Sequence, residues 1–481
     1  MIPSIALEIS VVCLGIFLLL FESFIYRQDK RYLAWIATSG IFLILVASFF
    51  TAQPSGGADS NPFYVHDAPG IFFKRFMLVA TALTVLLAVD FTEVFSRYIP
   101  SERKGAGVGE FYILPIFVCA GLMWMTTAAD FIMIFVALEL VTIGFYVLVA
   151  SMRKNKAALE AGVKYLILGA LSTGFFVYGL TWIFGTTGQT SLQAITEILP
   201  ELSPERYTGL LFGFGLVMVA LGFKIAAFPF QFWVADVYQG AATPVTAFLS
   251  VASKAAGFIV LIRIIEPFLE VSFLRDRVLT MIYFLAGATM LYGNLAAMPQ
   301  NNLKRLLAYS SISHAGFLLL GVASVYSGRA GQAVAFYLAS YLLMTFSAFA
   351  VLIIVSRNSL SDEISDFNGL FKRSPSLALA LMISMLSLAG VPLTAGFLGK
   401  FFIFESALSS ELFLLVVIGI VAVGCGYYYY FKVIRAIFWQ APAEGASPLK
   451  TPTATSVTLA ILSTATILFG IFPQPIFLLM R

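Results

Sequence analysis

Six ionisable side chains lie inside or near the ends of apolar stretches of the sequence, where a charge has few partners. They are four lysines, one glutamate and one histidine: Lys164, Lys224, Lys254, Lys400, Glu139 and His314. A charge at the centre of a lipid bilayer costs about 2.5–3.5 kcal/mol on insertion scales. Five lipid-facing charges would cost on the order of 15 kcal/mol, which is comparable to the stability of a whole protein. We therefore expect these side chains to face the protein interior, water or one another.

Lysines and a carboxylate in such places are suited to moving protons. Burial in general lowers the pKa of a lysine, and a nearby carboxylate raises it again. A lysine that exchanges partners can therefore load and release a proton near neutral pH. A lone histidine is more often structural, but His314 could bridge two lysines because the pKa of histidine is close to neutral. The group predicts a proton or ion path; the alternative is structural pairing, in which one acid would have to serve four lysines.

The elements that must hold these residues are membrane-spanning helices. The chain has 481 residues, of which 60% are hydrophobic and only 11% charged, with a net charge of +4. Soluble proteins carry about 25% charged residues, so the composition excludes a soluble enzyme, a disordered regulator and a disulfide-stapled secreted module. Nothing in it suggests nucleic acid as a partner. Stretches long enough to span a bilayer occur at about 4–24, 32–52, 73–95, 110–127, 130–150, 157–184, 206–228, 243–264, 278–297, 302–323, 330–355, 376–404, 411–434 and 455–472. They predict an all-α polytopic membrane protein with about 14 transmembrane helices.

Residues that could hold a cofactor are scarce. The three cysteines, Cys13, Cys119 and Cys425, are far apart and form no CxxC pair. His66 and His314 are the only histidines, so we expect no haem and no iron–sulfur cluster held by this chain alone. No glycine-rich nucleotide fingerprint follows a strand-like run. We expect no cofactor and no metal site in this chain.

The distribution of basic residues predicts the orientation. Seventeen basic residues follow odd-numbered stretches, whereas eight, including Lys74 and Arg263, are assigned to the opposite side. By the positive-inside rule the seventeen are cytoplasmic, which places both termini on the outer side. The first stretch carries Glu8 and Glu22 and lacks a basic leader, so we expect a retained helix and no cleavable signal.

Two of the lysine-bearing stretches contain helix breakers. Lys224 lies in "LGFKIAAFPFQFW", five residues before Pro229, and Lys400 lies in "LAGVPLTAGFLGKFF", after Pro392. Proline interrupts a helix, and the freed backbone groups inside a membrane need other partners. Broken helices at matching positions mark ion sites in inverted-repeat transporters. We therefore expect two inverted five-helix repeats, helices 4–8 and 9–13, with helices 7 and 12 broken. The corresponding domains are 1–109 (three helices), 110–264, 265–440 and 441–481 (the last helix).

A run of four tyrosines, Tyr427–Tyr430, lies near the end of the thirteenth stretch. Tyrosine is enriched where a membrane meets water. The run therefore predicts an interfacial belt in preference to a substrate platform.

The sequence around these residues resembles a known family from about residue 110 to 435. The most specific parts are "ALELVTIGFYVLVA", "AGVKYLILGALSTGF", "GFKIAAFPFQFWVADVYQGA", "PVTAFLSVASKAAGF", "NLKRLLAYSSISHAGF" and "GVPLTAGFLGKFFIF". The chain resembles the antiporter-like, proton-translocating subunits of bacterial NADH:quinone oxidoreductase (respiratory complex I), a family shared with the multisubunit Mrp sodium/proton antiporters. At the lysine of "GFLGKF" the chain resembles the N-like and L-like branches, because the M-like branch carries glutamate at that position. The short C-terminus favours the N-like branch, whose sixth-helix lysine Lys164 matches.

The resemblance implies roles for the other five residues. Glu139 matches the fifth-helix glutamate, and Lys224 matches the seventh-helix lysine that pairs with it. Lys254 matches the central lysine of the eighth helix, and His314 matches the polar relay position beyond it. Lys400 matches the terminal charge of the twelfth helix.

The resemblance also implies a function, a location and partners. It implies a subunit of a proton-pumping translocase of the respiratory chain in the bacterial inner (plasma) membrane, without redox chemistry of its own. NADH, FMN, iron–sulfur clusters and quinone would be bound by partner subunits, and the membrane neighbours would be M-type and small K/J-type subunits. Protons would move from the cytoplasm to the outside through the Glu/Lys/His relay. The alternative is a subunit of an Mrp-type antiporter; a purely structural scaffold is disfavoured by the cost of the buried charges.

Overall fold

The structure of the chain is a computed structural model, which describes residues 3–24, 29–51, 62–99, 107–324, 328–357, 359, 361–442 and 447–480. Four basic residues that the orientation count includes, Arg27, Arg103, Lys104 and Arg481, lie outside these residues.

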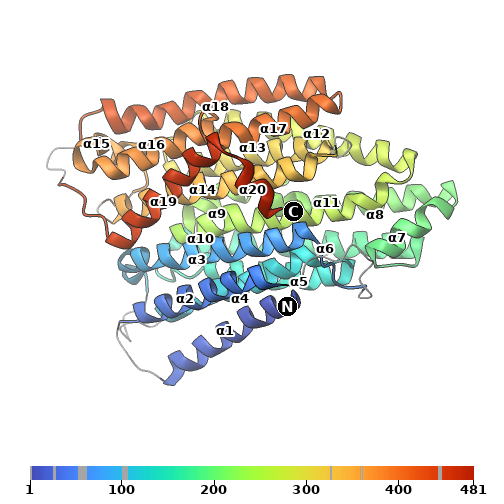
Figure 1. Cartoon of the computed structure of the whole chain (residues 1–481), viewed down its shortest axis with the longest axis horizontal. Helices are drawn as coiled ribbons and strands as arrows, with labels where there is room; N and C mark the ends of the chain where they lie inside the picture. Colours follow the sequence, from blue (N-terminus) through green and yellow to red (C-terminus); the bar gives the residue numbers. More distant parts are fainter. Residues whose placement is uncertain are drawn as a thin grey trace.

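Within the described residues, long helices run side by side in one bundle (Figure 1). Thirteen of them are long and apolar enough to cross a membrane. The remaining predicted stretch, 376–404, is present as two shorter helices, α16 (Pro375–Ala389) and α17 (Ala395–Ser409). The predicted all-α class and the fourteen apolar segments are therefore confirmed.

The helices follow the predicted order along the chain. The first three are α1 (Ile5–Phe24), α2 (Arg31–Ala47) and α3 (Ala68–Arg97). The next predicted unit holds α4 (Val108–Thr127), α5 (Phe131–Val149), α6 (Lys156–Thr187), α7 (Leu192–Ile198), α8 (Tyr207–Ile225), α9 (Val234–Gly240), α10 (Thr243–Phe248) and α11 (Lys254–Ile265). The second holds α12 (Ser272–Ala297), α13 (Leu303–Ala323), α14 (Ala330–Ser356), α15 (Leu370–Arg373), α16, α17 and α18 (Phe413–Trp439), and the chain continues with α19 (Thr453–Ile471) and α20 (Gln474–Leu479).

Helices 7 and 12 are broken where the sequence predicts it. The first half of helix 7, α8, ends at Ile225, and Ala226 follows with a φ of 65°. The first half of helix 12, α16, ends at Ala389, and Gly390 follows with a φ of 87°. A left-handed residue of this kind ends a helix and leaves its last carbonyls available to other donors.

Helix 8 contains a π-helical turn that the sequence does not predict. Its residues Leu249–Ser253 form a π-helical turn between α10 and α11. The turn is fully buried and immediately precedes Lys254. Single π turns inside α-helices often occur at functional sites, and this one ends at the residue before Lys254.

The three N-terminal helices are packed into the rest of the bundle. In Figure 1 they lie along one side of it, with α18 along the opposite side. Helix α3 contacts α4 and α10 of the first unit and also α14 of the second. The predicted boundary at residue 109 is therefore a division of the sequence across which the helices are in extensive contact.

Candidate proton-relay site

Lys224 of α8 contacts Thr142 on α5, the helix of Glu139, but Lys224 and Glu139 form no ion pair within 4.0 Å in the part of the chain that the structure describes. Lys224 is buried in the last turn of α8, and its Nζ donates a hydrogen bond to Thr142 Oγ1 of α5 at 3.1 Å. Glu139 lies one turn before Thr142 and is half-buried. Its Oε1 accepts a hydrogen bond from Thr173 Oγ1 of α6 at 2.6 Å. The direct pairing that the resemblance implied is therefore absent from this arrangement, in which each charge is held by a threonine hydroxyl.

Lys254 lies at the centre of the bundle, directly after the π turn of helix 8. Its side chain is buried, and its Nζ donates to the carbonyl oxygen of Ser311 on α13. The ring of Tyr341 lies 5.9 Å from Nζ. The ammonium is thus held by a backbone dipole and an aromatic face, which both favour a positive charge. Helix 8 and helix 10 meet at this contact.

His314 lies one helical turn beyond Ser311 on α13 and connects three helices. Its Nδ1 is 2.6 Å from Tyr337 Oη of α14, and its Nε2 is 3.0 Å from Tyr430 Oη of α18. All three side chains are buried. Since both ring nitrogens have a hydroxyl partner, the histidine can receive a proton on one nitrogen and give one up from the other.

Lys400 lies in the second turn of α17, on the far side of the break in helix 12. Its Nζ reaches back across the break and donates to the carbonyl oxygens of Leu388 and Ala389, each at 2.9 Å. These are the last carbonyls of α16, where the helix dipole is negative. Lys224 also lies at the end of a half-helix, α8. Helices 7 and 12 therefore each place an ammonium at the C-terminal end of their first half.

Tyr337 lies between His314 and the helix that carries Lys400. A methyl group added at Gly399, the residue before Lys400, would lie 2.8 Å from the Tyr337 ring. The ring therefore rests directly on the backbone of α17. Lys254 contacts Ser311 on the helix of His314, and Tyr337 binds His314 and rests beside Lys400; we call Lys254, Ser311, His314, Tyr337 and Lys400 the buried row.

Lys164 does not belong to this buried row. Its side chain is 42% exposed, and its Nζ lies 2.7 Å from both Asp236 Oδ2 and Glu160 Oε1. Asp236 also binds Arg305 Nη1 at 2.9 Å. Glu160, Lys164 and Asp236 line an open cavity of about 170 Å³ at the end of the bundle where α6 begins. Lys164 therefore lies among carboxylates at an open cavity, which is one of the surroundings expected for these charges.

The residues of this row lie within a recognised sequence family. A family model described as "NADH:quinone oxidoreductase/Mrp antiporter, TM" matches residues 128–426, more than half of the chain. The chain belongs to the NADH:quinone oxidoreductase/Mrp antiporter family.

Relatives of this family match the chain over nearly its whole length. The NADH-quinone oxidoreductase subunit N of Moorella thermoacetica is 37% identical over 471 residues, which cover 98% of this chain and 95% of the relative. The subunit N of a Geobacillus species is 40% identical and covers 93% of this chain and 91% of its own. A chain of respiratory complex I from Thermus thermophilus with bound aureothin has a TM-score of 0.79 at 30% identity, with 97% of each chain covered. A chain of the Mrp complex from Dietzia sp. has a TM-score of 0.78 at 20% identity, with 99% of this chain and 96% of that one covered, and shares the fold.

The interfacial prediction is wrong for two of the four tyrosines in the run, whereas Tyr428 is 60% exposed. Tyr429 and Tyr430 are each 1% exposed and lie inside the bundle. Tyr430 contacts His314 and Ser310, and Tyr429 donates to Asn294 Oδ1 of α12 at 2.9 Å. Four consecutive tyrosines cover every face of a helix, so some of them must point inward. That periodicity is the sequence signal that part of the run lies inside the bundle.

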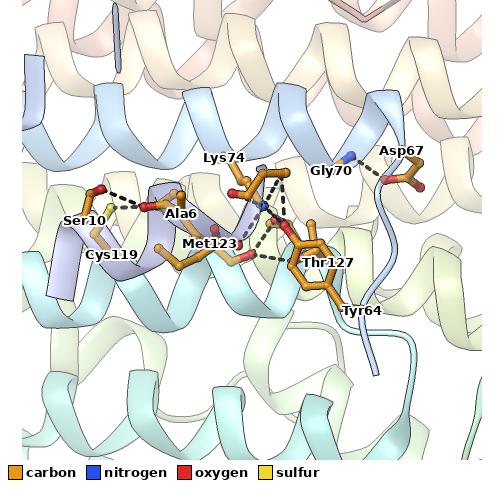
Figure 2. Close-up of polar contacts among 12 residues, drawn as sticks. Ala6, Ser10, Tyr64, Asp67, Gly70, Lys74, Cys119, Met123 and Thr127 are labelled. Carbon is orange, nitrogen blue, oxygen red and sulfur yellow. Dashed lines mark hydrogen bonds and ion pairs between the residues drawn. The ribbon is translucent and has the colours of Figure 1, made fainter. Parts of the chain in front are cut away.

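A second missed group lies among the N-terminal helices. Lys74, which the orientation count assigned to a loop, lies inside α3 with no exposed side-chain surface. Its Nζ is 2.7 Å from Oε1 of Glu8 on α1, which is also completely buried (Figure 2 shows the surroundings of Lys74). The sequence signal was the glutamate inside the first apolar stretch, which requires a partner in a membrane.

In the described residues no group of three or more histidine, cysteine or acidic side chains could hold a metal ion.

Proposed function

We propose that the chain is a proton-translocating membrane-arm subunit, of the N type, of NADH:quinone oxidoreductase. The observation that carries this proposal is the buried row Lys254–Ser311–His314–Tyr337–Lys400 in a chain whose relatives are named subunit N of that enzyme. NADH, FMN, iron–sulfur clusters and quinone belong to partner subunits in this proposal. The membrane neighbours are the M-type and small K/J-type subunits, and the location is the bacterial inner membrane, with both termini outside.

The proposed mechanism uses two positions of the Lys224 ammonium. In the arrangement described, the ammonium binds Thr142, and Glu139 binds Thr173. A short movement along α5 would bring the ammonium to the carboxylate, because the two partners are one helical turn apart. When Lys224 pairs with Glu139, its positive charge is neutralised and repels the Lys254 ammonium of helix 8 less strongly. The energy of the protonated Lys254 therefore changes. In this way the energy released by electron transfer in the partner subunits reaches the membrane helices of this chain as a change in charge pairing.

Proton transfer then follows the buried row. Protons are taken up at the cavity that Lys164 and Asp236 line, pass to Lys254, and continue through His314 toward Lys400. Lys254 and Lys400 have only carbonyl oxygens as hydrogen-bond acceptors among the described residues. Their protonated forms are therefore held by backbone dipoles and aromatic rings, and a charge that appears or disappears nearby changes the energy of the protonated form. The four domains expected from the sequence remain part of this proposal.

Replacing Lys224 by alanine tests the switch. We expect the Lys224→Ala complex to assemble and to reduce soluble artificial electron acceptors at the wild-type rate, but to pump fewer protons, because the mobile charge is gone. Proton translocation into sealed vesicles and quinone-reductase activity are the two measurements. Wild-type values for both in the variant would contradict the switch.

Replacing Glu139 by glutamine tests its partner. Glu139→Gln keeps the hydrogen bond from Thr173, since the amide oxygen still accepts, but removes the negative charge. We expect a milder loss of pumping than in Lys224→Ala, because Lys224 retains its charge and loses only one of two positions. Unaltered coupling in Glu139→Gln would mean that the carboxylate is structural.

An antiporter subunit exchanging sodium for protons is the second candidate, since the family includes Mrp antiporters. Both candidate functions require the same buried row, so the row does not distinguish between them. Co-purification decides between them: a peripheral arm with flavin and iron–sulfur clusters supports the first proposal, and small antiporter subunits without such an arm support the second.

A further inference from the structure

The buried pair Glu8–Lys74 lies outside the row just described and has no part in the proposed relay. Glu8 is in the first turn of α1, and Lys74 is in the second turn of α3. Neither side chain has any exposed surface, and their closest N–O distance is 2.7 Å. Figure 2 shows the Lys74 side chain beside the ring of Tyr64, with Asp67 and Gly70 nearby on the same helix. The pair therefore lies near the end of the bundle at which α3 begins.

The oxygens around Lys74 outnumber its protons. Its Nζ donates to Ser4 Oγ at 2.7 Å, to Ser4 O at 3.3 Å and to Tyr64 Oη. With Glu8 Oε1 this makes four acceptors for the three N–H groups of an ammonium. Apart from the ion-pair contact of Oε1 with Lys74, neither carboxylate oxygen of Glu8 has a hydrogen-bond partner in the part of the chain that the structure describes. The cluster can accept a proton without any rearrangement of its heavy atoms.

Two protonation states fit the same positions. In the charged state the ammonium faces the carboxylate. In the neutral state one N–H bond has broken and an O–H bond has formed on Glu8, which donates to the lone pair of Nζ, while the two remaining N–H groups serve Ser4 and Tyr64. The positive and the negative charge cancel, and no other reactant is needed. Burial opposes the charged state and the short contact favours it, which is the balance that proton exchange requires.

The pair is connected to the helix that carries Lys254. Asp67 caps α3 by accepting from Gly70 N at 2.9 Å, and its Oδ1 also binds Arg263 Nη2 at 2.8 Å. Arg263 is in the last turn of α11, whose first residue is Lys254, and its Nε donates to Thr126 O of α4 at 3.0 Å. Asp67 and Lys74 are seven residues apart and therefore lie on the same face of α3. Asp67 therefore places Arg263 and the end of α11 on the side of α3 that carries Lys74.

The cluster is also connected to the start of α5. The residue after Tyr64, Val65, donates its backbone N–H to Thr127 O at 2.8 Å, and Ala129 N donates to Phe63 O at 3.2 Å. This pairing joins the segment before α3 to the turn between α4 and α5. The helix of Glu139 therefore begins within a few residues of the cluster.

We propose that Glu8, Lys74 and Tyr64 form a proton-exchange site coupled to helix 8 through Asp67 and Arg263. The proposal rests on the proposed function and extends it: the site takes part in proton release on the side of the membrane at which α3 begins. The simpler role would be a permanently charged pair that only holds α1 against α3. The two roles differ in whether Glu8 changes protonation during turnover.

Glu8→Gln in the complete, purified complex tests the exchange. Infrared difference spectra of the wild type during NADH-driven turnover should contain a change in the C=O stretching band of a protonated carboxylic acid, and Glu8→Gln should lack that change. Protons translocated per NADH oxidised should fall, because the proton that Glu8 transfers in the wild type has no carrier in the variant. An unchanged proton yield, or the same carboxylic acid band in both proteins, overturns the proposal.

Glu22→Gln is the matched control, because Glu22 is on the same helix and is paired with Lys30 near its other end. It should leave both the spectrum and the proton yield unchanged. If Glu8→Gln does not assemble, the double variant Glu8→Gln/Lys74→Met, which removes both charges at similar volume, takes its place, and a normal proton yield in it also overturns the proposal. Normal translocation in Lys254→Met would overturn the proposed function itself, so the two failures can be told apart.

Discussion

Replacing Lys254 by methionine is expected to stop proton transfer through this subunit, with a loss on the order of 100-fold. Methionine fills a similar volume in this buried position but carries no proton. The row then loses the group that connects helix 8 to Ser311 and, through α13, to His314. The measurement is the initial rate of proton translocation in vesicles that contain the purified complex, with NADH oxidation by soluble acceptors recorded in the same preparation.

Two further variants decide how Lys254 acts. Lys254→Arg keeps a positive charge, but a guanidinium does not release its proton in proteins. A proton carrier therefore fails as arginine, whereas a static counter-charge is preserved. Lys372→Met makes the same substitution at an exposed lysine of α15 and should behave as the wild type. Full pumping by Lys254→Arg would contradict a carrier role.

The second large effect is expected from Gly293→Val, which should prevent α12 and α13 from packing. A Cβ at Gly293 would lie 2.3 Å from the backbone N of Ser313, and one at Gly316 would lie 2.5 Å from the backbone N of Met290. The two backbones therefore touch at both glycines, as small residues permit in membrane helices. Because the clash is with main chain, the helices must separate, at a cost of about 3 kcal/mol or more. The thermal denaturation midpoint in detergent and the amount of assembled complex measure it.

Gly185→Val provides the comparison for this substitution. Gly185 is also inside a long helix, α6, but is exposed, and nothing lies within 4 Å of a Cβ built there. Both variants replace a helical glycine by the same β-branched residue, so their intrinsic helix propensities cancel. Equal denaturation midpoints for the two would show that the close approach of α12 and α13 contributes nothing to stability.

The sequence predicted the features that depend on composition and on proline. Apolar stretches located the helices because a bilayer requires a fixed length, and Pro229 and Pro392 located the breaks because proline cannot continue a helix. The buried lysines stood out because a membrane interior tolerates few charges. Their partners could not be predicted, since those of Lys254 and Lys400 are backbone carbonyls, which every residue has.

Other features depend on which face of a helix is turned inward. Lys74 lies close to the end of its apolar stretch, where a loop residue and a buried residue have the same sequence context; only its contact with Glu8 of α1 distinguishes them. Tyr430 was misassigned for the same reason. The π turn before Lys254 has no proline or unusual residue to announce it and results from the packing of helix 8.

The contacts of Lys400 with Leu388 and Ala389 have a consequence for how this protein can be dissected. The ammonium is solvated by main-chain oxygens at the end of a half-helix, and no exchange of side chains can delete them. A mutational scan will therefore find Lys400 and miss the groups that hold its charge. Chemical replacement of the backbone would reach them: an ester in place of the peptide bond that carries the Ala389 carbonyl makes that oxygen a weaker acceptor. The negative partners of Lys400 are carbonyl oxygens whose position depends on where α16 ends, and no amino-acid substitution removes a carbonyl oxygen.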